Sequence, residues 1–332
     1  MALRFMDGCD WAGSRSDIGM KWDAIVYPNV LNGGRTNPSG KSYQTDGWPA
    51  VKKILDAQAT WIAGRGFYAN TTGTPTSGGR MIIEFLDSGT RQLGLEVSNG
   101  ALRVLRGSTV LATSSYTLQG QQWYYIELKA TIHGSAGSYE VRVNRQTVLS
   151  ATGVNTQNTA NASANEVGFG GDGTSWGDDF YICDATGTRN NDFLGDVEVV
   201  TLMPAGAGNY AQWTPLSGAN WENVDEIPQD GDTSYNYSAT AGQKDTFGAQ
   251  TYSATGTPLG LQVNLIHRKD DAGSRTIRTL LRSGGADYSG TSESVLDSYS
   301  HAFDVWETDP ADSADWTDTK INAAEYGYEM VS

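Results

Sequence analysis

The sequence is poor in the residues that usually build disulfide scaffolds and metal centres. It has only two cysteines, Cys9 and Cys183, and three histidines among its 332 residues. Two cysteines are too few for a disulfide scaffold, and their neighbours show no metal-binding spacing. We therefore expect both to be free, buried thiols, as is usual in a chain kept in a reducing cytosol.

Long apolar runs are missing as well. No run approaches the roughly 20 apolar residues that a membrane-spanning helix needs. The first residues, Met1–Gly8, lack the basic region and the long apolar core of a signal peptide. We expect neither membrane insertion nor export by the chain itself.

Catalytic patterns are also absent. His133, His267 and His301 lie in separate predicted strands or turns, and no serine or cysteine lies in a nucleophile elbow. Retaining glycosidases hold two carboxylates about 5 Å apart, which on one strand requires alternate positions. The nearest pair, Glu84 and Asp87, has an odd spacing that sends the two side chains to opposite faces. We expect no enzymatic activity.

The glycine-rich segment 33–42 offers no nucleotide site. Five residues separate Gly34 from Gly40, one more than a phosphate-binding loop has, and Asp46–Pro49 prevents a long helix after it. We expect no cofactor, apart from the calcium ion considered below.

Glycine, by contrast, is abundant, with 40 residues, and there are ten tryptophans. This composition favours short strands joined by turns over helices. Three segments alternate apolar and polar side chains with the two-residue period of half-buried strands: Gly120–Ala130, Ser138–Leu149 and Trp176–Asp184. Together they resemble the core of the concanavalin A-like lectin/laminin G fold. The resemblance implies an all-β chain that begins with a jelly-roll sandwich, a fold shared by lectins, glycanases and structural modules.

The chain is long enough for two domains. We predict a concanavalin A-like sandwich over residues 1–187 and a second, smaller β-sandwich over residues 192–332, with the polar segment Thr186–Asn191 as linker. The first domain contains one predicted helix, Ala50–Ala57. The strands predicted for the second part are Val197–Leu202, Lys244–Gly248, Gly260–His267, Ile277–Arg282, His301–Glu307 and Ala324–Met330.

Charge divides the chain near the same place. Residues 1–190 hold 16 Lys and Arg against 16 Asp and Glu, whereas residues 191–332 hold 7 against 22, so the whole net charge of −15 lies in the second part. An acidic surface repels phosphate backbones, which argues against nucleic acid as a partner. A solvated acidic surface and a surface for a basic partner both stay open.

Five aspartates are candidate calcium ligands. Asp172, Asp178 and Asp179 flank the last predicted strand of the first domain, and Asp7 and Asp10 follow its first strand. If those strands are neighbours in the sheet, the five carboxylates would meet around one cation, and oxygen ligands are what calcium prefers. Alternatively, the aspartates cap turns by accepting hydrogen bonds from backbone N–H groups.

Four aromatic residues in predicted loops are candidate glycan contacts: Trp48, Trp176, Trp221 and Tyr235. Sugars bind by stacking on flat aromatic faces and by hydrogen bonds to neighbouring polar groups. The alternative is that these side chains pack long loops onto the sandwich, since large apolar groups are usually buried.

Short segments along the whole chain resemble tailed-bacteriophage virion proteins that carry a concanavalin A-like domain. The segments are Leu3–Asp10, Gly177–Asp184, Asn191–Val197, Ala241–Thr246, Arg268–Gly273, Arg282–Gly285, Glu307–Pro310 and Asn322–Glu325. The resemblance implies a non-enzymatic structural protein of the virion exterior, attached to tail or capsid, with other virion proteins as partners and assembly in the host cytoplasm. It carries over no role for any single residue.

Two functions therefore stay open. One is an accessory or decoration protein present in many copies, and the other is a glycan-binding adhesin, such as a tail fibre or head fibre, that contacts a host-surface glycan. A protein on a symmetric particle is expected to form a homo-oligomer. Because like charges repel, we expect residues 1–190 to dock on the particle or on neighbouring copies and residues 191–332 to project outward.

Overall fold

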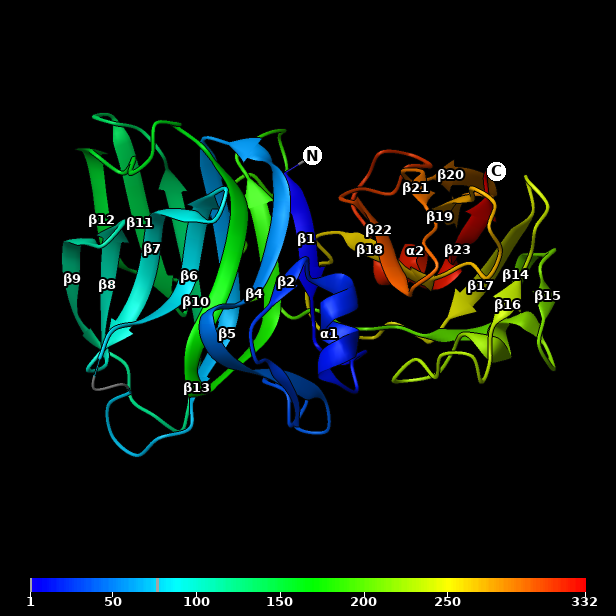
Figure 1. Cartoon of the computed structure of the whole chain (residues 1–332), viewed down its shortest axis with the longest axis horizontal. Helices are drawn as coiled ribbons and strands as arrows, with labels where there is room; N and C mark the ends of the chain where they lie inside the picture. Colours follow the sequence, from blue (N-terminus) through cyan, green and yellow to red (C-terminus); the bar gives the residue numbers. More distant parts are fainter. Residues whose placement is uncertain (1, 76–77) are drawn as a thin grey trace. The chain divides into compact units, whose positions relative to one another are not determined.

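The computed structural model describes residues 2–75 and 78–332, apart from the side chain of Trp48. The chain divides into two compact units, the first ending at Val199 and the second spanning Val200–Ser332. Nearly all of their secondary-structure elements are strands (Figure 1), which confirms the all-β prediction. In the described part of the chain, no helix is both long and apolar enough to cross a membrane.

One antiparallel sheet, with thirteen strands among the described residues, makes up the first unit. Its main path runs through β12 (Gln146–Val154), β11 (Gly137–Val143), β10 (Trp123–Thr131), β5 (Thr60–Ala69), β13 (Ala164–Asp184), β6 (Arg80–Asp87), β7 (Thr90–Ser98), β8 (Ala101–Arg106) and β9 (Thr109–Thr117). Beside this path, β1 (Leu3–Asp7) and β4 (Lys41–Gln58) pair with β13, while β2 (Ala24–Ile25) and β3 (Asn29–Asn32) pair with β4. The two ends of the path, β12 and β9, lie close together, so the sheet curves back on itself (Figure 1).

Strand β13 allows this curvature because it belongs to both parts of the sheet. Residues 166–169 pair with β6, and residues 175–184 pair with β5. The strand bends between them, at Gly170 and Gly171. A Cβ at Gly170 would lie 2.7 Å from the carbonyl oxygen of Gly47, so a glycine is needed where β4 passes this closely.

Arg65 of β5 is fully buried beneath the bend. Its Nη1 donates to the carbonyl of Gly170 at 2.8 Å, its Nη2 to that of Trp176 at 3.0 Å, and its Nε to that of Gly66 at 3.1 Å. Burial lowers the pKa of the Arg65 guanidinium to about 9. Arg65 therefore satisfies backbone groups of the bend from inside the core. The large fully buried apolar side chains of this core include Phe5, Trp61, Phe67, Phe85, Phe169 and Phe180.

The helix predicted at Ala50–Ala57 is wrong. These residues form the second half of β4, in which Val51 pairs with Phe169 of β13. A short local helix preference is weak, and pairing with a buried strand overrides it. The helix of the first unit is α1 (Arg15–Lys21), which the sequence analysis missed.

Both cysteines are free and buried, as predicted. The first and last strands of the unit are neighbours, with Leu3 paired to Cys183 in the β1–β13 ladder. Cys9 lies beyond the other end of β1, where its Sγ is 3.7 Å from the carbonyl oxygen of Gly177. The register therefore keeps the two thiols at opposite ends of this ladder.

A smaller antiparallel sheet organises the second unit. Its six strands, counted over the described residues, are β14 (Pro204–Ala211), β17 (Lys244–Ala249), β23 (Glu325–Met330), β19 (Thr276–Ser283) and β20 (Ala286–Ser289) in that order, with β21 (Glu293–Ser294) beside β19. Two separate pairs are β15 (Thr214–Pro215) with β16 (Asn236–Tyr237), and β18 (Leu261–His267) with β22 (Ser300–Trp306). The short helices are η1 (Asn220–Asn223) and α2 (Asp318–Ala323).

Strand β18 packs over this sheet. Its residues Leu265 and Leu261 each contact an apolar cluster. One cluster consists of Phe247, Ile277, Val295 and Tyr328, and the other of Leu281, Trp316, Ile321 and Ala324. The second unit therefore has a core of its own.

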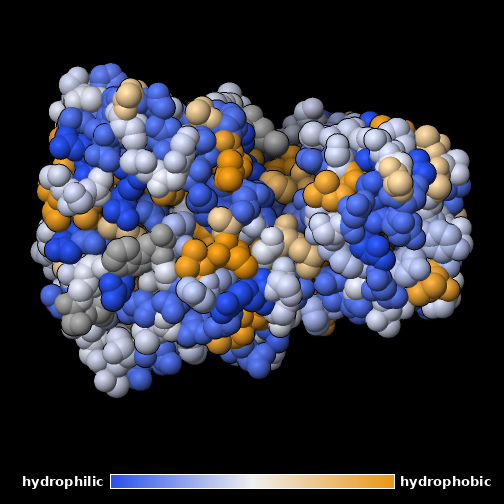
Figure 2. Space-filling model, in the orientation of Figure 1, coloured by the Kyte–Doolittle hydropathy of each residue, from blue (hydrophilic) through white to orange (hydrophobic). Residues whose placement is uncertain are grey.

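The hydropathy of the surface residues does not by itself indicate a binding site. On the face drawn in Figure 2, hydrophilic residues cover most of the surface, and apolar residues form small, separate patches. Scattered apolar side chains are normal on protein surfaces. A site in this protein must be recognised by how particular side chains are grouped.

Candidate functional site

Three aromatic side chains form a row across one face of the first unit's sheet. Trp123 of β10 pairs in register with Tyr68 of β5, and Tyr68 pairs with Trp176 of β13. Register partners on neighbouring antiparallel strands point to the same face. The Tyr68 ring stacks on Trp176 at 4.6 Å and lies 5.4 Å from Trp123. All three residues of this aromatic row are half-buried, so each keeps some surface in solvent.

Polar side chains continue the aromatic row on the next two strands. Gln44 of β4 pairs with Trp176, and Asn29 of β3 pairs with Gln44. The Asn29 amide donates to Gln44 Oε1 at 3.1 Å, and Arg15 Nη2 donates to Asn29 Oδ1 at 3.1 Å. Gln44 in turn donates to the carbonyl of Gly173. These hydrogen bonds orient the two amides beside Trp176.

This grouping has the chemistry of a sugar-binding surface. One face of Trp176 stacks on Tyr68, and Gln44 is its register partner on the neighbouring strand β4. The apolar face of a sugar can stack on an indole ring while its hydroxyls bond to nearby polar groups. Amides suit hydroxyls because both groups donate and accept hydrogen bonds. The arrangement therefore supports binding.

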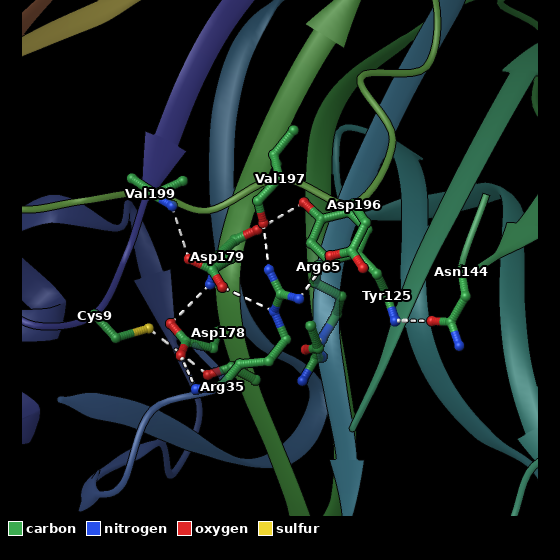
Figure 3. Close-up of polar contacts among 12 residues, drawn as sticks. Cys9, Arg35, Arg65, Tyr125, Asn144, Asp178, Asp179, Asp196, Val197 and Val199 are labelled. Carbon is green, nitrogen blue, oxygen red and sulfur yellow. Dashed lines mark hydrogen bonds and ion pairs between the residues drawn. The ribbon is translucent and has the colours of Figure 1, made fainter. Parts of the chain in front are cut away.

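An acidic cluster follows Trp176 along β13. Figure 3 shows its carboxylates, Asp178 and Asp179, around Arg35. The register of β13 against β5 shifts between Asp178, which pairs with Gly66, and Tyr181, so the strand bulges there. Asp179, inside the bulge, has a φ of 51°, in the left-handed region. The bulge brings the carboxylates of both Asp178 and Asp179 to Arg35.

Arg35 connects these carboxylates to a later part of the chain. Its backbone N–H donates to Asp178 Oδ2 at 2.7 Å, and its Nε donates to Asp179 Oδ2 at 2.8 Å. Its Nη1 lies 2.6 Å from Asp196 Oδ1, and its Nη2 donates to the carbonyl of Val197 (Figure 3). One arginine thus links β13 to the segment that follows it.

Burial dominates the electrostatics of the acidic cluster. It raises the pKa of Asp178, and the nearby Asp179 carboxylate raises it further. Burial also raises the pKa of Asp179, although the charge of Arg35 opposes this rise. The Cys9 thiol has a raised pKa because it is buried and lies near these carboxylates. Cys9 therefore stays protonated and unreactive in the folded protein.

The segment Asp192–Val199, which we call the strap, binds to the same face of the sheet. Its backbone N–H groups donate from Leu194 to Tyr181 Oη at 3.3 Å, from Gly195 to Glu127 Oε1 at 2.8 Å, and from Val199 to Asp179 Oδ1 at 2.8 Å. An ion pair joins Lys129 Nζ to Asp192 Oδ1 at 3.0 Å, and the Arg142 guanidinium lies 4.1 Å from the ring centre of Phe193. The strap is therefore part of the first unit.

The strap changes two of the predictions. The first unit ends at Val199, later than the boundary predicted between residues 187 and 192, because side chains of the sheet bind the chain beyond β13. The strand predicted at Val197–Leu202 is absent. Its apolar alternation resembles that of a strand, but the N–H of Val199 bonds to a carboxylate rather than to a neighbouring strand.

The five candidate calcium ligands have other partners. Asp7 is fully buried and accepts hydrogen bonds from the backbone N–H of Cys9 and the side chains of Trp11, Lys21, Trp22 and Tyr43. Asp10 accepts from the Lys41 N–H, and Asp172 accepts from Thr174 and Ser175, as a turn cap does. Asp178 and Asp179 bind Arg35. Within residues 2–75 and 78–332, no group of three His, Cys, Asp or Glu is placed to hold a metal ion, so the predicted calcium site is not assembled.

The four candidate glycan contacts belong to different parts of the chain. Trp176 belongs to the aromatic row, and the side chain of Trp48 lies outside what the structure describes. Trp221 packs against the cluster around Phe247 in the second unit, so for this residue the packing alternative holds. Tyr235, 37% exposed, is also in the second unit, with its ring 6.1 Å from that of Tyr237.

Sequence reasoning missed most of the aromatic row and its amides. Trp123 lies in the predicted strand segment Gly120–Ala130, but the sequence does not show that its ring faces Tyr68 and Trp176. Gln44 and Asn29 carry no signal for the site, because only the strand order brings residues so distant in sequence together.

No protein-family model matches the sequence, and no curated protein is detectably similar to it. Among solved structures, the chain is similar to the cellulose-induced protein Cip1, with 17% identity and a TM-score of 0.39 over 54% of this chain and 96% of that one. It is also similar to Trypanosoma rangeli sialidase (16% identity, TM-score 0.35, 47% of this chain, 26% of that one) and to the alginate lyase Aly36B (12%, 0.32, 47% and 80%). With identities and TM-scores this low, function must be argued from the residues of this chain.

Proposed function

We propose that this protein binds glycans through the aromatic row and its amides, without cleaving them. The observation that carries the proposal is the single register line of Trp123, Tyr68, Trp176, Gln44 and Asn29 across five neighbouring strands. Rings that served only the core would be fully buried, whereas these are half-exposed and adjoin polar amides. Of the two functions that the sequence left open, glycan binding is the better supported.

The shape of the line favours a glycan chain over a single sugar. It crosses four steps between strands of about 4.8 Å each, or about 19 Å in all. Each contact is weak, since one hydrogen bond contributes about 0.5–1.5 kcal/mol net. Several sugars along the line would add their contributions, so we expect affinity to rise with chain length and to reach the micromolar range.

This proposal is tested by probing a glycan array with the full-length protein. Calorimetric titration of a glycan that binds on the array then gives the affinity. We expect Trp176→Ala and Tyr68→Ala each to weaken binding about tenfold, the equivalent of about 1.4 kcal/mol. Tyr116→Ala is the matched control, because it removes a half-buried tyrosine of β9 that lies outside the row. Unchanged affinity in both row variants would contradict the proposal.

Whether the bound glycan is cleaved can be measured by the release of reducing ends. Glu84 is buried and paired with Arg91 at 2.7 Å, and its spacing from Asp87 gave no pair on one face. We therefore expect the bound glycan to show no new reducing ends after long incubation. Release of reducing ends that is abolished by Glu84→Gln would overturn this part of the proposal.

We propose separately where the protein acts. The resemblance to virion proteins supports a place on a bacteriophage particle, as a tail- or capsid-attached accessory protein or as an adhesin that meets a host-surface glycan. Other virion proteins and further copies of this chain would then be its partners. Cryo-electron microscopy of intact particles tests this, and particles without density for either unit would contradict it.

A further inference from the structure

The strap covers a surface that continues the aromatic row. Tyr125 and Glu127 follow Trp123 at alternate positions of β10, so they lie on the same face of the sheet. Across β5, Tyr181 of β13 stacks parallel to Tyr125, with ring centres 6.4 Å apart. The face beneath the strap thus offers rings and polar groups, as the row does, but with the strap bound these side chains are almost fully buried.

At the centre of this covered surface, strand β5 contributes no side chain. On this face, the two positions of β5 that come before Tyr68 in the sequence are glycines, Gly66 and Gly64. A Cβ at Gly66 would lie 2.7 Å from Cδ of Arg35, and one at Gly64 would lie 2.2 Å from the ring of Tyr181. With no side chain from β5 in the way, Arg35 and the Tyr181 ring occupy the space above the strand.

Glu127 shows that the strap fills this surface imperfectly. Its side chain is fully buried, and Oε1 accepts hydrogen bonds from Tyr181 Oη at 2.5 Å and from the Gly195 N–H at 2.8 Å. Its other oxygen, Oε2, has no hydrogen-bond partner among the described residues. A buried carboxylate oxygen without a donor is unfavourable, and a sugar hydroxyl would be a donor of the right kind.

The strap is held to the sheet by polar contacts and not by an apolar core. It contains no strand or helix, and none of its residues is buried. Its ion pairs, Lys129–Asp192 and Arg35–Asp196, each include an exposed aspartate, and such pairs contribute little to stability. The backbone N–H groups of Leu194, Gly195 and Val199 donate to buried side chains of the sheet. A competing ligand with more contacts on the same face could replace them.

We propose that the strap is a displaceable cover over the second half of the glycan-binding face. A short glycan binds the aromatic row with the strap in place. A longer chain displaces the strap and stacks on Tyr125 and Tyr181, and its hydroxyls donate to Glu127 in place of the Gly195 N–H. This inference rests on the proposed function. The long glycan shifts the equilibrium between the bound and the displaced strap because it binds more tightly when the strap is displaced.

Hydrogen exchange of the strap amides in the full-length protein tests the inference. The probes are the disaccharide and the octasaccharide fragments of the glycan that scores on the array. The N–H groups of Leu194, Gly195 and Val199 report on the strap directly, because each donates to a group of the sheet. We expect the octasaccharide to accelerate their exchange about threefold to fivefold and the disaccharide to leave it unchanged.

Two variants sharpen the test. Asp196→Asn removes the ion pair with Arg35, so it should accelerate exchange of the three amides without any glycan and tighten octasaccharide binding about threefold to fivefold, with no effect on the disaccharide. Glu198→Gln is the matched control, because it removes an exposed charge of the strap and should change neither quantity.

The outcomes separate the two proposals. Octasaccharide binding with unchanged exchange of the three amides would overturn the strap inference and leave the proposed function standing. Absence of binding by both fragments would overturn the proposed function and, with it, the inference. Equal tightening of disaccharide and octasaccharide by Asp196→Asn would also overturn the inference, because the strap would then act on the row itself.

Discussion

Asp178 and Asp179 are consecutive residues of β13, yet both carboxylates accept hydrogen bonds from Arg35, at 2.7 Å from its backbone N–H and 2.8 Å from its Nε. Side chains of consecutive residues in a regular strand point to opposite faces, so the bulge at Asp179 is what makes this possible. One arginine charge faces two buried carboxyls. The single positive charge cannot neutralise both carboxylates when both are ionised.

We predict that the first unit loses stability as the pH rises from about 5 to about 9. Burial raises the pKa of Asp179 to about 6 and that of Asp178 to about 8. A carboxyl with a raised pKa binds its proton more tightly in the folded state, so its stabilising effect is full below about pH 4 and is lost as the pH passes the folded values. Urea unfolding at several pH values, followed by pulse labelling of thiols, measures this because Cys9 and Cys183 are both buried in the first unit.

The variant Asp178→Asn should show a smaller loss, because one of the two interacting carboxyls can no longer ionise. A wild-type protein whose first unit becomes more stable over the same pH range would contradict the electrostatic account of the acidic cluster.

Arg65→Met should destabilise the first unit by about 2–4 kcal/mol, since it leaves buried carbonyls at the bend of β13 without their donors. The urea midpoint from the same thiol labelling gives the value. Arg106→Met, at a half-buried arginine of β8, is the control and should change stability by less than about 0.5 kcal/mol. Equal effects of the two substitutions would mean that Arg65 does not hold the bend.

Two of the three tryptophans that the sequence analysis grouped together, Trp221 and Trp176, should behave differently. Trp221→Ala opens the cluster around Phe247 and Tyr328, so we expect a loss of about 2 kcal/mol in the second unit. Hydrogen exchange of β17 and β23 should then accelerate, with β10 unaffected. Trp176→Ala should weaken glycan binding with little change of exchange in either unit, and faster exchange throughout the first unit would make Trp176 a core residue instead.

The state of the cysteines gives a simple check of the fold. Neither thiol of the native protein should react with a thiol reagent within minutes, since both are buried and the pKa of Cys9 is raised. After denaturation without reductant, two thiols per chain should be titrated. A count of zero would reveal a disulfide that this register of β1 and β13 does not allow.

Strand patterns predicted much of the architecture. The alternation in Gly120–Ala130 falls on β10, and the predicted strands Lys244–Gly248 and Ile277–Arg282 fall on β17 and β19. The segment Ser138–Leu149, predicted as strand throughout, spans most of β11 and the start of β12, with a hairpin turn between them. Alternation failed at Ala50–Ala57, where pairing with β13 decides the structure. It also failed at Val197–Leu202, where side chains of the sheet bind the backbone of the strap.

The candidate site was much harder to predict. Trp176 was found because a tryptophan in a predicted loop near polar residues suggests a sugar contact, but its partners come from strands far apart in the sequence. Only the strand order places Asn29 and Trp123 on one line. The aspartates were expected to gather around calcium, whereas nearby donors such as Lys21 and Arg35 satisfy them. Sequence spacing does not reveal such donors.

The most direct test of glycan binding by the aromatic row is the NMR spectrum of the tryptophan indole N–H groups, recorded while the array-identified glycan is added to the full-length protein. Trp→Phe variants assign the ten indole signals. We predict that the signals of Trp123 and Trp176 shift on addition, while those of the fully buried Trp61 and Trp316 do not. Shifts confined to tryptophans of the second unit, or binding that moves neither Trp123 nor Trp176, would contradict the account.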